Sequence, residues 1–167
     1  MGSRARGTLL YILGLALLVA PGCGYSVHGR SSLPFTEIHI VKIENRTTEP
    51  KLEDKLYEAL VQEFMRNGIA VTAGAACSIS GVVLDYHMVS LSEKKDITVE
   101  YRVLLNADFV FQDAEGTTRN VKTGLPFIVS FSGQGAMANL LANRDVAEKQ
   151  AMADIAMEIV GALIYKK

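Results

Sequence analysis

The sequence is short of cysteine: it has only two, Cys23 and Cys77, in 167 residues. A framework of several disulfides is therefore excluded, and the fold has to be stabilised by its hydrophobic core. A basic excess is missing too, because 17 basic residues face 18 acidic ones and the formal net charge is −1. That balance argues against a nucleic-acid binder, which would concentrate positive charge.

Membrane-spanning runs and catalytic motifs are also missing from the sequence. The main apolar run, residues 9–20, is too short for a bilayer core, which takes roughly 20 helical residues. No Walker A loop, Rossmann fingerprint or nucleophile elbow occurs, and the histidines lack metal-ligand spacing. Asp85 and His87 share a strand face without a nucleophile. We therefore expect no enzyme and no metal site, and a plain surface position for this pair.

The apolar run does belong to a recognisable leader. Arg4 and Arg6 precede it, and residues 19–23 (Val-Ala-Pro-Gly-Cys) follow it. A basic start, a short apolar run and small residues are typical of a secretory signal. Residues 19–23 resemble the bacterial lipobox, which implies cleavage before Cys23 and acylation of its thiol. A plain signal peptide with a coincidental cysteine, or an uncleaved anchor helix, is the alternative.

Acylation of Cys23 would anchor the mature protein, because several buried acyl chains together give stable membrane attachment. The diacylglycerol and acyl groups are the expected covalent additions, with no other cofactor. Gly24, not Asp, follows the cysteine, and by resemblance to diderm lipoproteins this favours export to the outer membrane. We expect a signal peptide over residues 1–22, a lipidated tether over 23–36 and a single domain over 37–167. Cys77 is expected to be a buried structural thiol.

Two amphipathic helices are predicted in that domain. Residues 51–67 carry apolar residues at four-residue spacing, which places them on one helical face. Thr48 is a candidate N-cap for this helix. Residues 139–165 carry a second apolar stripe. The two stripes are Leu52, Leu56, Leu60 and Phe64, and Met152, Ile155, Ala156, Ile159, Val160 and Leu163.

Four strands are predicted, over residues 37–43, 78–91, 99–111 and 119–131. Residues 99–111 alternate apolar and polar side chains, the period-two pattern of a half-buried strand. A polar turn is expected at 92–96, and an interruption of the last strand near Pro126, which cannot donate to a sheet ladder. The order β-α-β-β-β-α indicates an α+β two-layer sandwich. We expect a mostly antiparallel four-stranded sheet with two helices on one face.

Several motifs in this order resemble the lipopolysaccharide-assembly lipoproteins, the LptE family. The mature start at residues 23–29 (Cys-Gly-Tyr-Ser-Val-His-Gly) is similar to the family's Cys-Gly-aromatic opening. Leu33 and Pro34 stand where the family has an aliphatic-Pro pair, and residues 100–103 (Glu-Tyr-Arg-Val) resemble its Glu-Tyr-polar-aliphatic strand. The last helix follows a loop, as in the family. The resemblance covers the mature chain in element order.

The resemblance implies a non-catalytic outer-membrane lipoprotein at the periplasmic face, anchored through its lipid. Such a protein would plug an outer-membrane β-barrel of the LptD type and assist lipopolysaccharide transport. The barrel and lipopolysaccharide are then the expected partners, with no nucleic acid. Because lipid A carries phosphates, basic side chains are candidate contacts. Lys94 and Lys95 in the polar turn, and Arg144 near the last helix start, hold the positions that the resemblance implies.

Two other functional classes remain open at this stage. Residues 38–45, followed by a helix, also resemble the opening of curli-secretion and TolB-type domains. The absence of a second α/β unit and the three consecutive strands favour the barrel plug over these. A periplasmic lipid-binding carrier is the other alternative, and it would need a deep apolar cavity.

Overall fold

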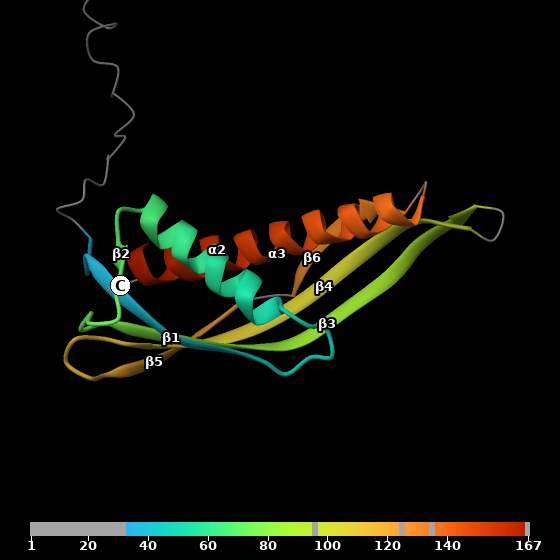
Figure 1. The fold of residues 1–167 in the computed structure, drawn as a ribbon. Coiled ribbons are helices and arrows are strands. Elements are labelled where there is room, and N and C mark those ends of the chain that lie inside the picture. The colour runs from blue at the N-terminus through green and yellow to red at the C-terminus, as the bar shows by residue number, and fades with distance from the viewer. Residues whose placement is uncertain (1–32, 95–96, 124–125, 134–135, 166–167) are drawn as a thin grey trace, which may run out of the picture. The chain divides into compact units, whose positions relative to one another are not determined.

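The computed structural model describes residues 33–94, 97–123, 126–133 and 136–165, which form one structural unit from Leu33 onward (Figure 1). Leu33 and Phe35 pack against the core, and the Phe35 ring centroid lies 5.5 Å from that of Phe111. The elements in chain order are β1 (Glu37–Asn45), α2 (Leu52–Arg66), β2 (Ala70–Val71), β3 (Ser78–Lys94), β4 (Ile97–Gln112), β5 (Thr118–Lys122), β6 (Phe127–Ser132) and α3 (Met137–Tyr165).

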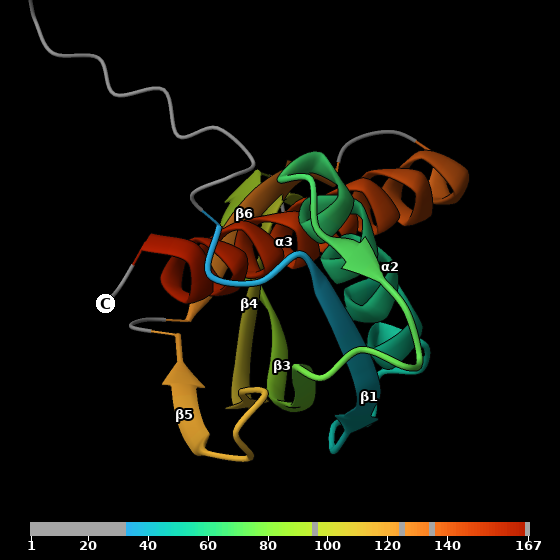
Figure 2. The same ribbon diagram turned by 90° about the vertical axis from the view of Figure 1, so that its left-hand side faces the viewer.

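The strands form one mixed sheet in the order β2-β1-β3-β4-β5, and β6 pairs with the other end of β4. β1 is parallel to β2 and β3, whereas β4 is antiparallel to β3, β5 and β6. Both helices lie on one face of the sheet, as Figures 1 and 2 show. The expected α+β two-layer architecture is therefore confirmed, with a six-stranded sheet in place of four strands.

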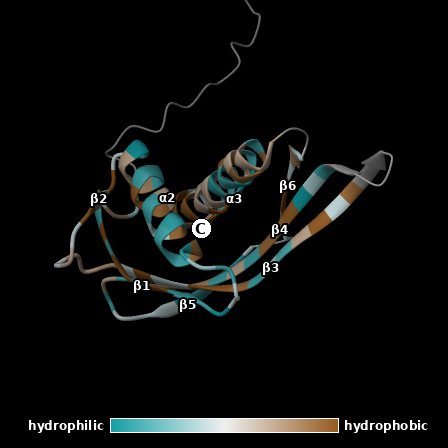
Figure 3. Cartoon of the chain, turned by 45° about the vertical axis from the view of Figure 1, so that its right-hand side comes forward, coloured by the Kyte–Doolittle hydropathy of each residue, from teal (hydrophilic) through white to brown (hydrophobic). Residues whose placement is uncertain are grey.

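The core lies between the helices and the sheet, and both predicted helical stripes face it. All four stripe residues of α2 are fully buried, as are five of the six in α3, and Leu163 is almost so. On β4, Val103, Leu105 and Ala107 are fully buried and alternate with partly exposed residues. Figure 3 shows this alternation as changes between hydrophobic and hydrophilic colour along the strand. Removal of this apolar surface from water is the main driving force for the fold.

The predicted strand over residues 119–131 is two strands. β5 ends at Lys122 and β6 begins at Phe127, with Pro126 just before it. β5 pairs with the Asp108–Gln112 end of β4, and β6 pairs with the Glu100–Leu105 end. The proline therefore interrupts pairing as expected, because it has no N–H for the ladder.

β3 extends into the region predicted as a polar turn, residues 92–96, and β4 begins directly after it. β3 continues to Lys94, which pairs with Ile97. β1 reaches only as far as the pairing of Asn45 with Val83. The remainder of β3 and its β4 partner thus extend as a long arm beyond the end of β1, which is visible in Figure 1. β6 pairs with β4 along part of this arm, at Glu100–Leu105.

The prediction that Thr48 caps the first helix is wrong. Lys51 occupies the N-cap position in the left-handed region, with φ 66°, and no side chain caps the helix. The Thr47 hydroxyl accepts the backbone N–H of Glu49, and the Asn45 side-chain oxygen accepts that of Thr47. These local bonds form a tight turn after β1, so the helix starts later than a cap at Thr48 would require.

Cys77 is buried just before β3, as expected of a structural thiol. Burial raises the pKa of its thiol, so the neutral form dominates at physiological pH. A thiol held neutral in this way is a poor nucleophile.

Candidate functional site

The four residues predicted to carry function do not meet in one place that the structure describes. Cys23 and Lys95 lie outside the described residues. Lys94 is the last residue of β3, at the end of the β3–β4 arm, and the structure describes its backbone only. Arg144 lies in the first half of α3. Of the four, therefore, only Arg144 has described side-chain surroundings.

Arg144 is engaged within the protein. Its Nε atom donates to Oε1 of Glu148 over 2.8 Å and to the hydroxyl oxygen of Tyr86 over 3.2 Å. Its terminal nitrogen forms an ion pair with Glu49, and its guanidinium carbon lies 5.7 Å from the Tyr86 ring centroid. The side chain is one-quarter exposed. Two carboxylates thus already balance its charge.

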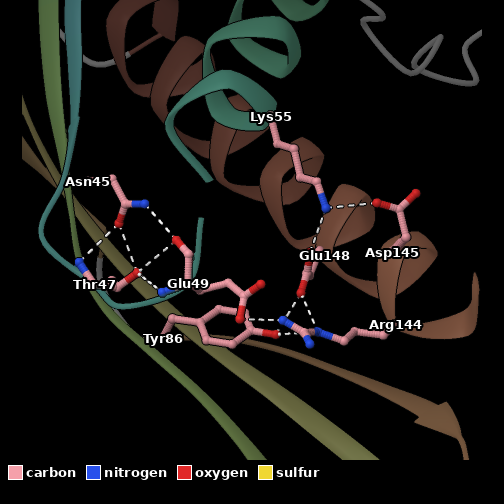
Figure 4. A network of polar contacts seen from close by, with 8 residues as sticks. All are labelled: Asn45, Thr47, Glu49, Lys55, Tyr86, Arg144, Asp145 and Glu148. Carbon is pink, nitrogen blue, oxygen red and sulfur yellow. Dashed lines mark hydrogen bonds and ion pairs between the residues drawn. The ribbon is translucent and has the colours of Figure 1, made fainter. Parts of the chain in front are cut away.

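Glu148 is the centre of this network, which Figure 4 shows. It is 3% exposed and receives hydrogen bonds from three different elements. Lys55 Nζ of α2 lies 2.6 Å from its Oε2, and the Tyr86 hydroxyl of β3 lies 2.6 Å from its Oε1. Arg144, one turn earlier on α3, supplies the third donor. A buried carboxylate needs such partners, because an unpaired buried charge is strongly destabilising.

The electrostatics agree with charged carboxylates and cations around a neutral tyrosine. Burial alone would raise the pKa of Glu148, but hydrogen bonds from Lys55, Tyr86 and Arg144 outweigh it and lower that pKa below its ordinary value. Hydrogen bonds from Lys149 and then Lys55 lower the pKa of Asp145 to about 2. Burial, and then the adjacent Glu148 carboxylate, raises the pKa of Tyr86, so its hydroxyl remains a donor.

The turn before α2 is tied to the same network. The side-chain amide of Asn45 donates to the backbone oxygen of Glu49 over 2.7 Å and to Glu53 over 2.8 Å. Glu49 in turn pairs with Arg144. We call Glu49, Lys55, Tyr86, Arg144 and Glu148 the polar clamp, because together they join the turn after β1, α2, β3 and α3.

A bulge in β3 places Tyr86 in the polar clamp. The register with β4 shifts between Val83 and Asp85, so Leu84 is an extra residue. Such a bulge re-aims the side chains that follow it. Tyr86 consequently faces the helices, while Asp85 and His87 are exposed on the other side. The predicted surface position of Asp85 and His87 is confirmed.

The polar clamp is built for structure, not for chemistry. Every charge in it has an opposite charge at contact distance, and the hydroxyl in it is held as a donor. Of its five residues only Arg144 was predicted from the sequence, which did not indicate Glu49, Lys55, Tyr86 or Glu148. The available signal was a charged residue inside the apolar stripe of α3, because Glu148 stands between the buried Ala147 and Ala151.

Within residues 33–165, leaving out the short gaps, no three His, Cys, Asp or Glu side chains are grouped to hold a metal ion. Across the same described residues, no helix combines the length and apolarity needed to cross a membrane.

Comparison with protein families decides the assignment. The family model for lipopolysaccharide assembly, LptE, matches residues 35–163, which is most of the chain and nearly all of the described unit. The chain belongs to the LptE family. The resemblance deduced from the sequence motifs is therefore confirmed.

Solved structures share the fold of this LptE-family chain. Rare lipoprotein B from Shewanella oneidensis is 9% identical, with a TM-score of 0.55 over 76% of this chain and 92% of that one. A lipoprotein from Caulobacter crescentus CB15 is 18% identical, with a TM-score of 0.53 over 72% of this chain and 86% of that one. Identities this low establish the fold alone. The search of curated proteins found no match.

Membership settles the broad class of the protein. The LptE family is a non-enzymatic lipoprotein family that acts in lipopolysaccharide assembly, so the expectation of a protein without catalysis is confirmed by the family match. The curli-secretion, TolB-like and carrier alternatives lose their support for the same reason.

Proposed function

We propose that this protein is an outer-membrane lipoprotein that plugs a β-barrel translocon of the LptD type and helps it deliver lipopolysaccharide. Cys23 would carry the acyl groups that hold the protein at the periplasmic face of the membrane. The match to the lipopolysaccharide-assembly family over residues 35–163 is the observation that carries this proposal. The lipobox-like leader supports the anchor.

The arm formed by β3 and β4 is the proposed contact for lipopolysaccharide. It extends beyond the Asn45–Val83 pair that ends β1, and it ends at the Lys94–Ile97 pair, next to Lys95. Met88, Val89 and Leu91 on the arm are each about two-fifths exposed. An arm with exposed apolar side chains, which ends in the sequence at two consecutive lysines, suits an amphiphile with phosphates, because ammonium groups form strong charge-assisted bonds to phosphate.

The base of the arm is held on the body. Val103, Phe131 and Ala147 form a second buried cluster, joined by Tyr101, whose ring stacks on Phe131 at 5.5 Å. The polar clamp fixes Tyr86 on the neighbouring strand. We propose that Arg144 serves lipopolysaccharide delivery mainly through this support, and that Lys94 and Lys95 make the phosphate contacts.

Purification from detergent-extracted outer membrane tests the proposed partner. The full-length protein with a C-terminal tag, expressed from its own host, should retain one β-barrel protein of high mass in a one-to-one ratio, together with lipopolysaccharide. A monomer, a ring of identical subunits or a protein holding a single acyl lipid would contradict the proposal.

Growth with labelled palmitate tests the anchor separately. Label should enter the wild-type protein and be absent from a Cys23→Ser variant, which should also leave the membrane fraction. Equal palmitate labelling and equal membrane association of the two proteins would reject Cys23 as the lipidation site. That result would not bear on the proposed barrel partner.

A further inference from the structure

β5 (Thr118–Lys122) is the outermost strand on its side of the sheet. Within the part of the chain that the structure describes, β4 is its only strand partner. In Figure 2 it stands at the edge beside which the C-terminal end of α3 passes. An edge strand presents a row of backbone donors and acceptors with which another chain can pair.

The register shows which residues present those groups. Across the turn, the backbone N–H of Asp113 donates to the oxygen of Thr117 over 3.0 Å. Hydrogen-bonded and non-hydrogen-bonded pairs alternate in an antiparallel ladder, so Arg119 and Val121 bond to β4. Asn120, between them, consequently directs its backbone N–H and C=O away from β4.

A groove runs beside this edge. It has a volume of about 370 Å³ and lies between residues 119–122 of β5 and the C-terminal half of α3. The helix contributes Glu158, Gly161, Ala162 and Tyr165, which are spaced so that they share one face. A Cβ atom added to Gly161 would meet nothing within 4 Å, so the helical wall is open there. An edge strand beside a helix is the arrangement that accepts an extended peptide by strand addition.

The charges on β5 indicate what kind of peptide fits. Arg119 lies on the helix side of the sheet, with its guanidinium carbon 5.1 Å from the Phe111 ring centroid. Lys122 lies on the opposite side, 70% exposed, and its nearest carboxylate, Asp108, is 3.9 Å away. Glu158 is the one acidic residue that lines the groove among those described. The strand thus carries two cations on a chain whose formal net charge is −1.

We propose that the groove between β5 and α3 binds an extended acidic segment of a partner protein, which adds to β5 as an antiparallel strand. Acidic side chains of the partner segment lie opposite Arg119 and Lys122, because opposite charges across a strand pair are stabilising. A small apolar side chain of the partner segment lies opposite Val121 and packs over Gly161 and Ala162. This site shares no residue with the tip of the β3–β4 arm, so it stands or falls independently of the proposed lipopolysaccharide contact.

Peptide binding to the full-length protein in detergent tests the proposal. The probe is a fluorescent, end-blocked peptide with Glu-Val-Thr-Glu-Thr at its centre, which sets the glutamates opposite Lys122 and Arg119. The matched control has Lys-Val-Thr-Lys-Thr. Fluorescence anisotropy should give saturable binding of the acidic peptide about tenfold tighter than that of the basic one. Equal binding of the two peptides, or no saturable binding of the acidic one, overturns the proposal.

Two variants at Asn120 test the pairing geometry. Asn120→Pro removes an outward N–H while leaving the bonds to β4, and proline is tolerated on such an edge. It should weaken binding by about tenfold, whereas Asn120→Ala, which keeps the N–H, should stay within about twofold of the wild type. Unchanged binding by a folded Asn120→Pro protein overturns the proposal. Should that variant not fold, Arg119→Glu decides, since it must reduce the preference for the acidic peptide.

Discussion

The hydroxyl of Tyr86 donates a 2.6 Å hydrogen bond to the carboxylate of Glu148, although the two residues are 62 positions apart. Tyr86 stands just after the β3 bulge, at the base of the β3–β4 arm. Glu148 stands on α3 and also binds Lys55 of α2. This bond therefore connects the arm proposed to contact lipid with both helices of the body.

Removing that hydroxyl should destabilise the protein. In a Tyr86→Phe variant Glu148 keeps Lys55 and Arg144 as donors, so the loss is one hydrogen bond to a charged group. We expect the free energy of unfolding to fall by about 1–2 kcal/mol. Urea unfolding followed by circular dichroism measures it. Tyr57→Phe is the matched control, since Tyr57 is exposed on α2, and it should change stability by less than about 0.5 kcal/mol. Equal losses in both variants would deny Tyr86 this role.

Stability should fall on acidification. Glu148 and Asp145 have pKa values below the ordinary 4.5 and 3.8, and that of Asp145 is about 2. A carboxyl whose pKa is lower in the folded state adds stability that is complete above its unfolded pKa and lost as the pH falls through its folded pKa. We expect the free energy of unfolding to decrease between about pH 5 and pH 2.

The Glu148→Gln variant is the comparison for that titration. It cannot ionise at residue 148, and it leaves Lys55 and Arg144 without their shared carboxylate. It should be less stable than the wild type at pH 7 and should lose less stability on acidification. If the free energy of unfolding fell equally with pH in the two proteins, the pH dependence could not be assigned to the polar clamp.

Close packing at Gly81 gives a third prediction. A Cβ atom there would lie 2.6 Å from Cε1 of Phe109, the residue paired with it on β4. Gly81→Ala should therefore lower the free energy of unfolding by about 1–3 kcal/mol. Gly161→Ala, on α3 with open space around it, should raise it by up to about 1 kcal/mol through better helix propensity. Thermal unfolding of both variants measures the contrast, and a neutral Gly81→Ala would show that Phe109 can move aside.

The basic tip of the arm should bind lipopolysaccharide through its phosphates. A Lys94→Glu/Lys95→Glu variant should bind it about tenfold more weakly while staying folded. Lys42→Glu/Arg46→Glu reverses the same amount of charge at exposed residues on the sheet face without helices, and it should bind lipopolysaccharide as the wild type does. Wild-type binding by the Lys94→Glu/Lys95→Glu variant would remove Lys94 and Lys95 from the site.

Arg144→Gln should mainly lower stability, because it breaks the bonds to Glu148 and Glu49.

The sequence predicts the parts of this fold that depend on local pattern. Leu52, Leu56, Leu60 and Phe64 define α2 because helical spacing alone places them together, and all four are buried. The alternation along β4 fixes its inward face in the same way, and Pro126 marks a break because it lacks an N–H. The family resemblance rests on motifs of this local kind.

Features that depend on residues far apart in the sequence could not be predicted from local pattern. β2 is only Ala70 and Val71, and it is a strand because it pairs with β1. The polar clamp unites Lys55 and Glu148, 93 positions apart, so no spacing rule reveals it. Arg144 was singled out for its charge, yet the carboxylates that compensate that charge come into view only once the chain is folded.

The central claim is that this LptE-family protein serves lipopolysaccharide delivery to the cell surface. Its most direct test is to deplete the protein in its host and to measure how much newly made, pulse-labelled lipopolysaccharide reaches the outer leaflet. We predict that the label stops beneath the surface, and that delivery returns with the wild-type gene. Undiminished arrival of labelled lipopolysaccharide in depleted cells would contradict the account.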